Sequence, residues 1–186
     1  MESSPKTVLV ALSGGCESVA CLYYGKSLGY NVHAFHVEFS NSSSQERTNC
    51  IKICDMLKVP LHEMSINYGD ATTDKHRIVD TAYWTPSVAW LATRKAIYDE
   101  VWFGIHNQDS LPFVGRVTST FDLLVKLTDI DINTKIVSPL WRMSKKEQYD
   151  MIDVDIQSLL VYCSTNKMDP CGECDKCLEW KSAIDV

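Results

Sequence analysis

A short apolar segment that stops abruptly at two glycines constrains the fold more than any other feature of the sequence. Residues 6–12 read KTVLVAL, which is typical of a buried strand, and Ser13-Gly14-Gly15 follows directly. A helix is predicted next, over residues 18–28. Backbone N–H groups and the positive end of the helix dipole then converge where an anion can bind. We therefore predict a phosphate-binding loop, with a plain strand-to-helix turn capped by Ser18 as the alternative.

The rest of the chain repeats this order of strand and helix. Strands are predicted over 30–39, 59–66 and 100–105, with a short one over 136–138, and helices over 45–57 and 86–97. Parallel neighbours need helical crossovers, so the pattern predicts a doubly wound, Rossmann-like α/β fold with a parallel sheet. Ligands bind such sheets at the carboxyl ends of the strands, where the turn-rich loops 41–44 and 68–74 also fall.

Size and charge restrict the classes of protein that fit. The chain has 186 residues, 45% of them hydrophobic and 23% charged, which suits one compact domain with a small appendage. A formal charge of −6 argues against extensive nucleic-acid binding and favours a small-molecule substrate. No apolar run reaches the ~20 residues of a membrane span, and the start MESSPK lacks the apolar core of a signal peptide. We expect a cytoplasmic protein that does not contact membranes.

Four cysteines lie close together near the end of the chain: Cys163, Cys171, Cys174 and Cys177. Four soft thiolates at this spacing suit a closed tetrahedral Zn²⁺ site of the structural kind. An iron–sulfur cluster is the rival interpretation, although the fourth cysteine precedes the C-x₂-C-x₂-C run here instead of following it. Reduced thiols or a redox C-x₂-C pair are the remaining alternative. We divide the chain into a nucleotide-binding α/β domain, 1–159, and a zinc-binding tail, 160–186.

The loop after the first strand has a specific resemblance. Ser13-Gly14-Gly15-Cys16-Glu17-Ser18 resembles the SGGxDS signature of the PP-loop ATP pyrophosphatases and matches neither of the glycine-rich motifs GxxxxGK[ST] and GxGxxG. Enzymes of that group bind ATP and release its pyrophosphate after adenylating a substrate. The resemblance implies a PP-loop type of fold and a nucleotide-binding segment made of Leu12, Ser13, Gly14, Gly15, Cys16, Glu17 and Ser18.

The loop and the cysteine tail together resemble the 7-cyano-7-deazaguanine synthase (QueC) family. Segments between them agree: 101–104 with 106–109 resembles the family's VVFGANADD-like stretch, and 138–140 with 144–147 resembles its TPL…TKAE segment. The resemblance implies a ligase that uses ATP and ammonia to convert 7-carboxy-7-deazaguanine into the nitrile. It also implies a homodimer.

The resemblance further implies which residues carry the chemistry. Glu17 stands where the family has Asp and, with Asp109, would hold Mg²⁺ beside the phosphates, since Mg²⁺ prefers one or two carboxylates plus phosphate oxygens. His106 follows a predicted strand and is the third candidate catalytic residue, in contact with nucleotide or substrate. His33 and His36, which alternate along a strand, are expected to be structural.

Some positions depart from the family pattern. Only Gln45 and Arg47 match its YGQRH stretch, and Thr85-Pro86-Ser87-Val88 replaces its PGRN-like segment. These departures fall at the expected substrate face, so two alternatives stay open. One is another PP-loop enzyme that modifies a nucleotide or tRNA, which would need a catalytic cysteine to handle sulfur. The other is a binding protein without turnover.

Overall fold

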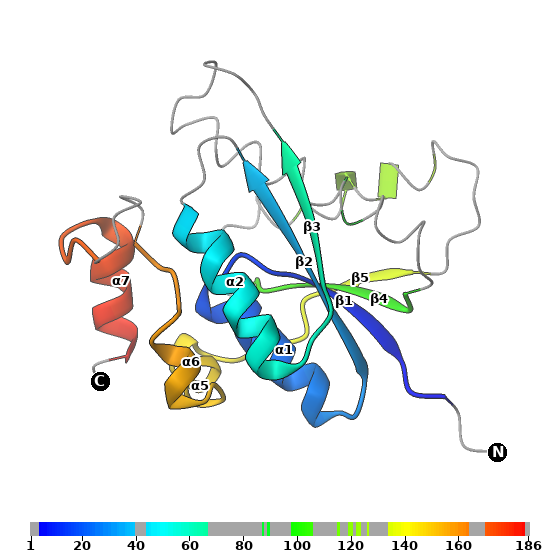
Figure 1. Cartoon of the computed structure of the whole chain (residues 1–186), viewed down its shortest axis with the longest axis horizontal. Coiled ribbons are helices and arrows are strands. Elements are labelled where there is room, and N and C mark those ends of the chain that lie inside the picture. Colours follow the sequence, from blue (N-terminus) through cyan, green and yellow to red (C-terminus); the bar gives the residue numbers. More distant parts are fainter. Residues whose placement is uncertain are drawn as a thin grey trace.

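The computed structural model describes most of the chain's regular structure (Figure 1). The described ranges are 4–39, 44–66, 98–105, 134–163 and 170–184, together with the single residues 87, 89, 115, 119, 120, 122, 123 and 126. The predicted helix over 86–97, the loops 41–44 and 68–74, His106 and Asp109 lie wholly or mostly outside these residues.

Five parallel strands form one sheet. They are β1 (Thr7–Ala11), β2 (Asn31–Phe39), β3 (Leu61–Ile66), β4 (Glu100–Phe103) and β5 (Lys135–Val137), in the order β3-β2-β1-β4-β5. The α/β architecture predicted from the sequence is therefore confirmed. The chain order reverses between β1 and β4, and the carboxyl ends of such strands are where open α/β sheets bind ligands.

Helices cover the sheet and continue into the C-terminal part. They are α1 (Cys16–Ser27), α2 (Ser44–Leu57), α5 (Lys145–Asp150), α6 (Val154–Gln157) and α7 (Asp175–Ile184). Figure 1 shows α1 and α2 in front of the sheet and α7 at the far side of the molecule from the N-terminus. None of the helices in the described part of the chain is long and apolar enough to cross a bilayer.

The first helix begins two residues before its predicted start. Gly15 has the extended conformation of an N-cap (φ −75°, ψ 159°), and the amide of Val19 donates to its carbonyl at 3.0 Å. Ser18 therefore lies inside the helix, where its hydroxyl donates to the Gly15 carbonyl at 2.9 Å. The interpretation of Ser18 as the N-cap is wrong, because an extended glycine lets the helix follow the strand sooner.

Side chains alternate between the two faces of the sheet and build two apolar clusters. Val8 and Val10 of β1 lie in the cluster that includes residues of α1 and α2, whereas Leu9 lies in the cluster on the opposite face. The helical residue Ala89 is buried in this second cluster, so both faces of the sheet carry helical residues. Successive side chains of a strand point to opposite faces of its sheet, so both faces can be apolar. The polar loops then lie at the carboxyl ends of the strands.

Candidate functional site

The loop Leu12–Ser18 occupies the carboxyl end of β1 and is ordered by its own hydroxyl groups. The amide of Ser13 donates to Ser18 Oγ at 3.2 Å, and the two hydroxyl oxygens are also 3.2 Å apart. Gly14 has φ +80°, a left-handed conformation that suits glycine. The first amides of α1 have no carbonyl partner within the helix, so this loop can present N–H groups to an anion.

Two neighbouring strands fix the loop in place. His36 of β2 is buried and its Nδ1 lies 2.9 Å from the Leu12 carbonyl oxygen, so this nitrogen carries the proton and donates it. Gly104, directly after β4, passes so close to α1 that a Cβ there would lie 2.6 Å from the Glu17 carbonyl carbon and 2.6 Å from the Ser18 nitrogen. The backbone of the loop is thus held from both sides.

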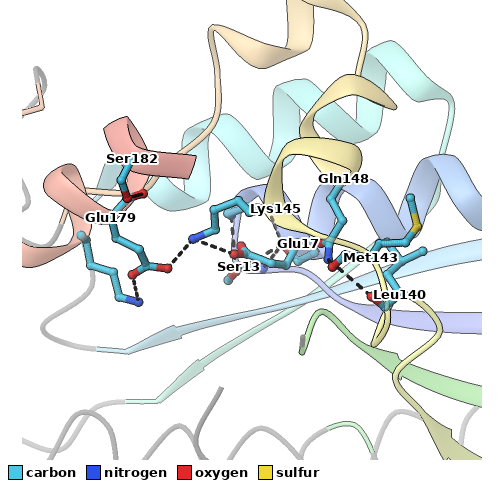
Figure 2. A network of polar contacts seen from close by, with 11 residues as sticks. Ser13, Glu17, Leu140, Met143, Lys145, Gln148, Glu179 and Ser182 are labelled. Atoms are coloured by element: carbon cyan, nitrogen blue, oxygen red, sulfur yellow. Dashed lines mark hydrogen bonds and ion pairs between the residues drawn. The ribbon is translucent and has the colours of Figure 1, made fainter. Parts of the chain in front are cut away.

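Glu17 enters a chain of ion pairs that the sequence analysis did not foresee. Its Oε1 lies 3.0 Å from Lys145 Nζ, and the same ammonium lies 2.6 Å from Glu179 Oε1 (Figure 2). Burial alone would lower the pKa of Lys145, but the two carboxylates outweigh it and raise the pKa, so the ammonium stays charged. The loop Leu12–Ser18 therefore has a largely buried cation beside its only acidic side chain, Glu17.

The thiols in the first third of the chain are poor nucleophiles. Burial, helped by the charge of Glu17, raises the pKa of Cys16 to about 12. Burial likewise raises the pKa of Cys21 and Cys50, and raises that of Cys54 to about 12. A thiol reacts as its thiolate, so these four side chains serve as small apolar groups in the core.

The structure brings the four C-terminal cysteines together. All four Sγ atoms lie within 4.8 Å of one another, with Cys163 to Cys171 at 3.6 Å and both Cys163 to Cys174 and Cys171 to Cys177 at 3.9 Å. Tetrahedral bonds of ~2.3 Å to one ion put sulfur atoms about 3.8 Å apart. The cluster thus has the dimensions of a site for a single metal ion.

A cavity of about 330 Å³ lies between α2 and the segment that leads to Cys163. Polar side chains of Gln45 and Asn49 line it on one side, and Tyr162 and Trp180 line it on the other. Gln45 is one of the two residues that match the family's substrate-face motif, whereas the other, Arg47, pairs with Glu63 at 2.8 Å. Val161 lines the cavity, and its amide donates a hydrogen bond to the Gly14 carbonyl, so the cavity and the loop Leu12–Ser18 share a wall.

Comparison with known proteins agrees with this geometry. The family model described as "Queuosine biosynthesis protein QueC" matches residues 7–87, which include β1, the loop and α1. A 7-cyano-7-deazaguanine synthase of Campylobacter jejuni is 24% identical over 203 residues, which cover 93% of this chain and 91% of the relative. The chain is therefore similar to the QueC family in its N-terminal half and to this synthase over nearly its whole length. The match to the synthase covers nearly the whole chain, so the likeness is not confined to the loop Leu12–Ser18.

Solved structures similar to this chain share its fold. A 4-thiouridine synthetase in complex with RNA and ATP superimposes with a TM-score of 0.65 at 14% identity, covering 90% of this chain and 45% of that one. The U34-tRNA thiolase NcsA of Methanococcus maripaludis, solved with its [4Fe-4S] cluster, gives 0.61 at 14% identity, covering 98% and 66%. The expected PP-loop type of α/β fold is thus confirmed.

Sequence reasoning found the loop and the cysteines but missed Lys145 and Glu179. Lys145 belongs to the segment 144–147, for which the sequence predicted a family resemblance but no contact with the loop. No sequence pattern pointed to Glu179, because 34 positions separate it from Lys145. His106 and Asp109, the other two candidate catalytic residues, lie outside the described residues and stay predictions.

Proposed function

We propose that the chain is a 7-cyano-7-deazaguanine synthase that consumes ATP, ammonia and 7-carboxy-7-deazaguanine. The observation that carries the proposal is the match to synthases along nearly the whole of both chains, with the SGGCES loop at the carboxyl end of β1. The cytoplasmic location and the homodimer remain predictions from the sequence.

The reaction begins by making a carboxylate into an electrophile. A carboxylate oxygen attacks the α-phosphorus of ATP, and pyrophosphate leaves. Ammonia then adds to the acyl carbon, the bond to AMP breaks, and loss of a proton leaves the amide. A second ATP activates the amide oxygen in the same way, with loss of pyrophosphate. Departure of AMP and loss of both protons from the nitrogen then give the nitrile. Each activation depends on nucleotide phosphates held in line with stabilised charge.

The loop residues Leu12 to Ser18 are proposed to hold those phosphates. Their support is the local geometry: a left-handed Gly14, an extended Gly15 and the start of α1, the end of a helix that favours an anion. Lys145 is proposed to face the phosphates as well, and the support is its ammonium, which lies 3.0 Å from the Glu17 carboxylate. When the ATP phosphates arrive, this cation would neutralise part of their charge.

Glu17, Asp109 and His106 are proposed as the catalytic residues. The Glu17 carboxylate is about one-fifth exposed at the loop, and one such carboxylate with phosphate oxygens and water suits Mg²⁺. When bound, Mg²⁺ would neutralise charge that develops on the leaving pyrophosphate. Glu17 would hold the ion, with Asp109 as its second carboxylate and His106 in contact with nucleotide or substrate.

Zinc is proposed for the four-cysteine cluster. The sulfur–sulfur distances of 3.6–3.9 Å suit bonds to a single ion, whereas an iron–sulfur cluster spreads its cysteines over several iron atoms. Four ligands close the site, so the role is structural. Elemental analysis should find about one zinc per chain, and iron with sulfide would contradict the assignment.

The sulfur-transfer alternative finds no support in the loop. Such a reaction needs an accessible cysteine with a usable thiolate, and the pKa of Cys16 is raised to about 12 by burial. The same holds for Cys21, Cys50 and Cys54, whose pKa values burial also raises.

The test is incubation of the protein with ATP, Mg²⁺, ammonia and 7-carboxy-7-deazaguanine, followed by mass spectrometry of the base. We expect the nitrile, with little product from Glu17→Gln because the charge that holds the ion is lost, and reduced product from Glu17→Asp. Asp155→Asn removes an exposed carboxylate of α6 and should leave product formation unchanged. No nitrile from the wild type would contradict the function, and equal product from Glu17→Gln would exclude Glu17 as the metal ligand.

A further inference from the structure

The metal-binding segment contacts the nucleotide loop at two separate places. The first contact lies two residues before Cys163, where the Val161 amide donates a hydrogen bond of 2.9 Å to the Gly14 carbonyl. The Val161 carbonyl oxygen is also close to the loop, since a Cβ on Gly15 would lie 3.6 Å from it. The backbone that supplies the first metal ligand thus also forms one wall of the loop.

The second contact comes from α7. Glu179 lies two residues after Cys177, and its Oε1 is 2.6 Å from Lys145 Nζ, which in turn is 3.0 Å from Glu17 (Figure 2). Its other carboxylate oxygen accepts a bond of 3.0 Å from Lys176. The acid that contacts the loop's lysine is therefore carried on the same helical turn as a metal ligand.

These two contacts are joined through the cysteines themselves. Cys163 and Cys177 belong to one group of four sulfur atoms, so an ion bound there ties the segment 161–163 to the start of α7. Trp180 of α7 stacks on Tyr162 with ring centroids 4.4 Å apart and planes 3° apart, which aligns the same two pieces. The position of Glu179 relative to Gly14 is thus set by the metal site and by this stacked pair.

The Glu179 carboxylate keeps the Lys145 ammonium beside the loop. Its side chain is only 10% exposed, and its ammonium lies between Glu17 and Glu179. When Glu17 turns toward a cation brought by the nucleotide, Glu179 still holds the ammonium beside the loop. Without Glu179, Lys145 would keep Glu17 as its partner, and the two would have to separate before Glu17 could bind the cation.

We propose that Glu179 is a positioning residue through which the four-cysteine segment sets the site of the Lys145 ammonium that faces the ATP phosphates. This inference rests on the proposed function. Through it, a metal site that takes no part in the chemistry would control nucleotide affinity.

The experiment measures ATP affinity by calorimetry in the presence of Mg²⁺, with metal content and thermal stability recorded for each variant. Glu179→Gln should weaken ATP binding about ten-fold, the scale of one lost hydrogen bond to a charged group, with metal content unchanged. Glu173→Gln is the matched control, because it removes an exposed carboxylate from the same segment and should leave ATP affinity unchanged.

A double-mutant cycle then asks whether Glu179 acts through Lys145. Lys145→Met should weaken ATP binding more than Glu179→Gln does, and adding Glu179→Gln to it should cause no further loss. Lys146→Met is its control, because this neighbouring lysine forms an ion pair with Asp150 at 2.6 Å on the same helix, and the variant should bind ATP normally. Additive losses, or normal ATP affinity in Glu179→Gln, would overturn the inference.

The two proposals fail in different ways. ATP binding requires no deazapurine, so a protein that shows the expected cycle but makes no nitrile would retain the positioning role and lose the proposed reaction. A protein that makes nitrile but binds ATP equally well with Glu179→Gln would retain the reaction and lose the positioning role. A wild-type protein that binds no ATP would contradict both.

Discussion

At the scale of single residues, Gly104 after β4 is the position where an added side chain would press directly on the backbone of the loop Leu12–Ser18. A Cβ there would lie 2.6 Å from two backbone atoms of Glu17 and Ser18, so α1 would have to move. We expect Gly104→Ala to lower the free energy of unfolding by about 1–3 kcal/mol, as overpacking does, and to weaken ATP binding. Urea unfolding and calorimetry measure both. Within the described part of the chain, a Cβ on the helical Gly115 meets nothing within 4 Å, so Gly115→Ala should lower neither stability nor ATP affinity. An unaffected Gly104→Ala would mean that the close approach at Gly104 is not needed.

The lowered pKa of the Glu100 carboxyl predicts that the stability of the fold depends on pH. Burial by itself raises its pKa, but hydrogen bonds from Lys6 at 2.6 Å and from the Trp102 indole at 2.7 Å outweigh burial and lower the pKa. A carboxyl whose folded pKa is depressed stabilises the fold above its unfolded pKa, ~4.3, and loses that contribution as pH falls through the folded value.

The measurement compares wild type with Glu100→Gln by urea unfolding at a series of pH values. The difference in the free energy of unfolding should be constant above about pH 6 and should shrink toward pH 3, because ~4.3 is the unfolded value. A difference that does not change with pH would show that the ion pair with Lys6 contributes nothing.

Among residues, the sequence could predict those whose chemistry is local. Gly14 and the four cysteines are recognisable because a left-handed turn needs glycine and clustered thiols suit a metal. The contact between Lys145 and Glu179 joins two helices that meet only in the folded chain, so no local pattern encodes it.

At the scale of elements, Gly25 lets α1 lie close to the sheet. A Cβ there would lie 2.7 Å from Val32 Cγ2 and 3.2 Å from the Trp102 ring. Replacing a helical glycine by alanine usually stabilises a protein by ~0.5–1 kcal/mol, but here Gly25→Ala should destabilise it by about 1–3 kcal/mol. Ser27→Ala, exposed on the same helix, should be near neutral. Thermal unfolding measures the stability of both variants, and a Gly25→Ala protein more stable than the wild type would contradict this close packing of α1 on the sheet.

Elements were easier to predict than their ends. The five strands lie within a residue or two of their predicted ranges, because apolar runs between turn residues mark them clearly. The start of α1 was missed because Gly15, which has no side chain to cap with, serves as N-cap. Helices α5, α6 and α7 were not predicted, since short helices with few apolar positions lack a clear period.

At the scale of the whole molecule, the metal should stabilise the fold. Cys174 belongs to the cluster that connects α7 to segment 161–163, and metal binding energy is folding energy. Cys174→Ser should therefore lose the metal and at least about 3 kcal/mol of stability, or roughly 6–12 °C in Tm. A chelator should destabilise the wild type and have no further effect on Cys174→Ser. Unchanged Tm in a metal-free variant would contradict a structural metal.

The central claim is that this chain activates a carboxylate by adenylating it, and oxygen transfer tests it most directly. The substrate is 7-carboxy-7-deazaguanine with both carboxylate oxygens labelled with ¹⁸O, and the AMP is analysed by mass spectrometry. Because each activation passes one oxygen to AMP, every nitrile formed should leave two AMP molecules that each carry one ¹⁸O. Unlabelled AMP, or label in water or inorganic phosphate, would contradict the claim.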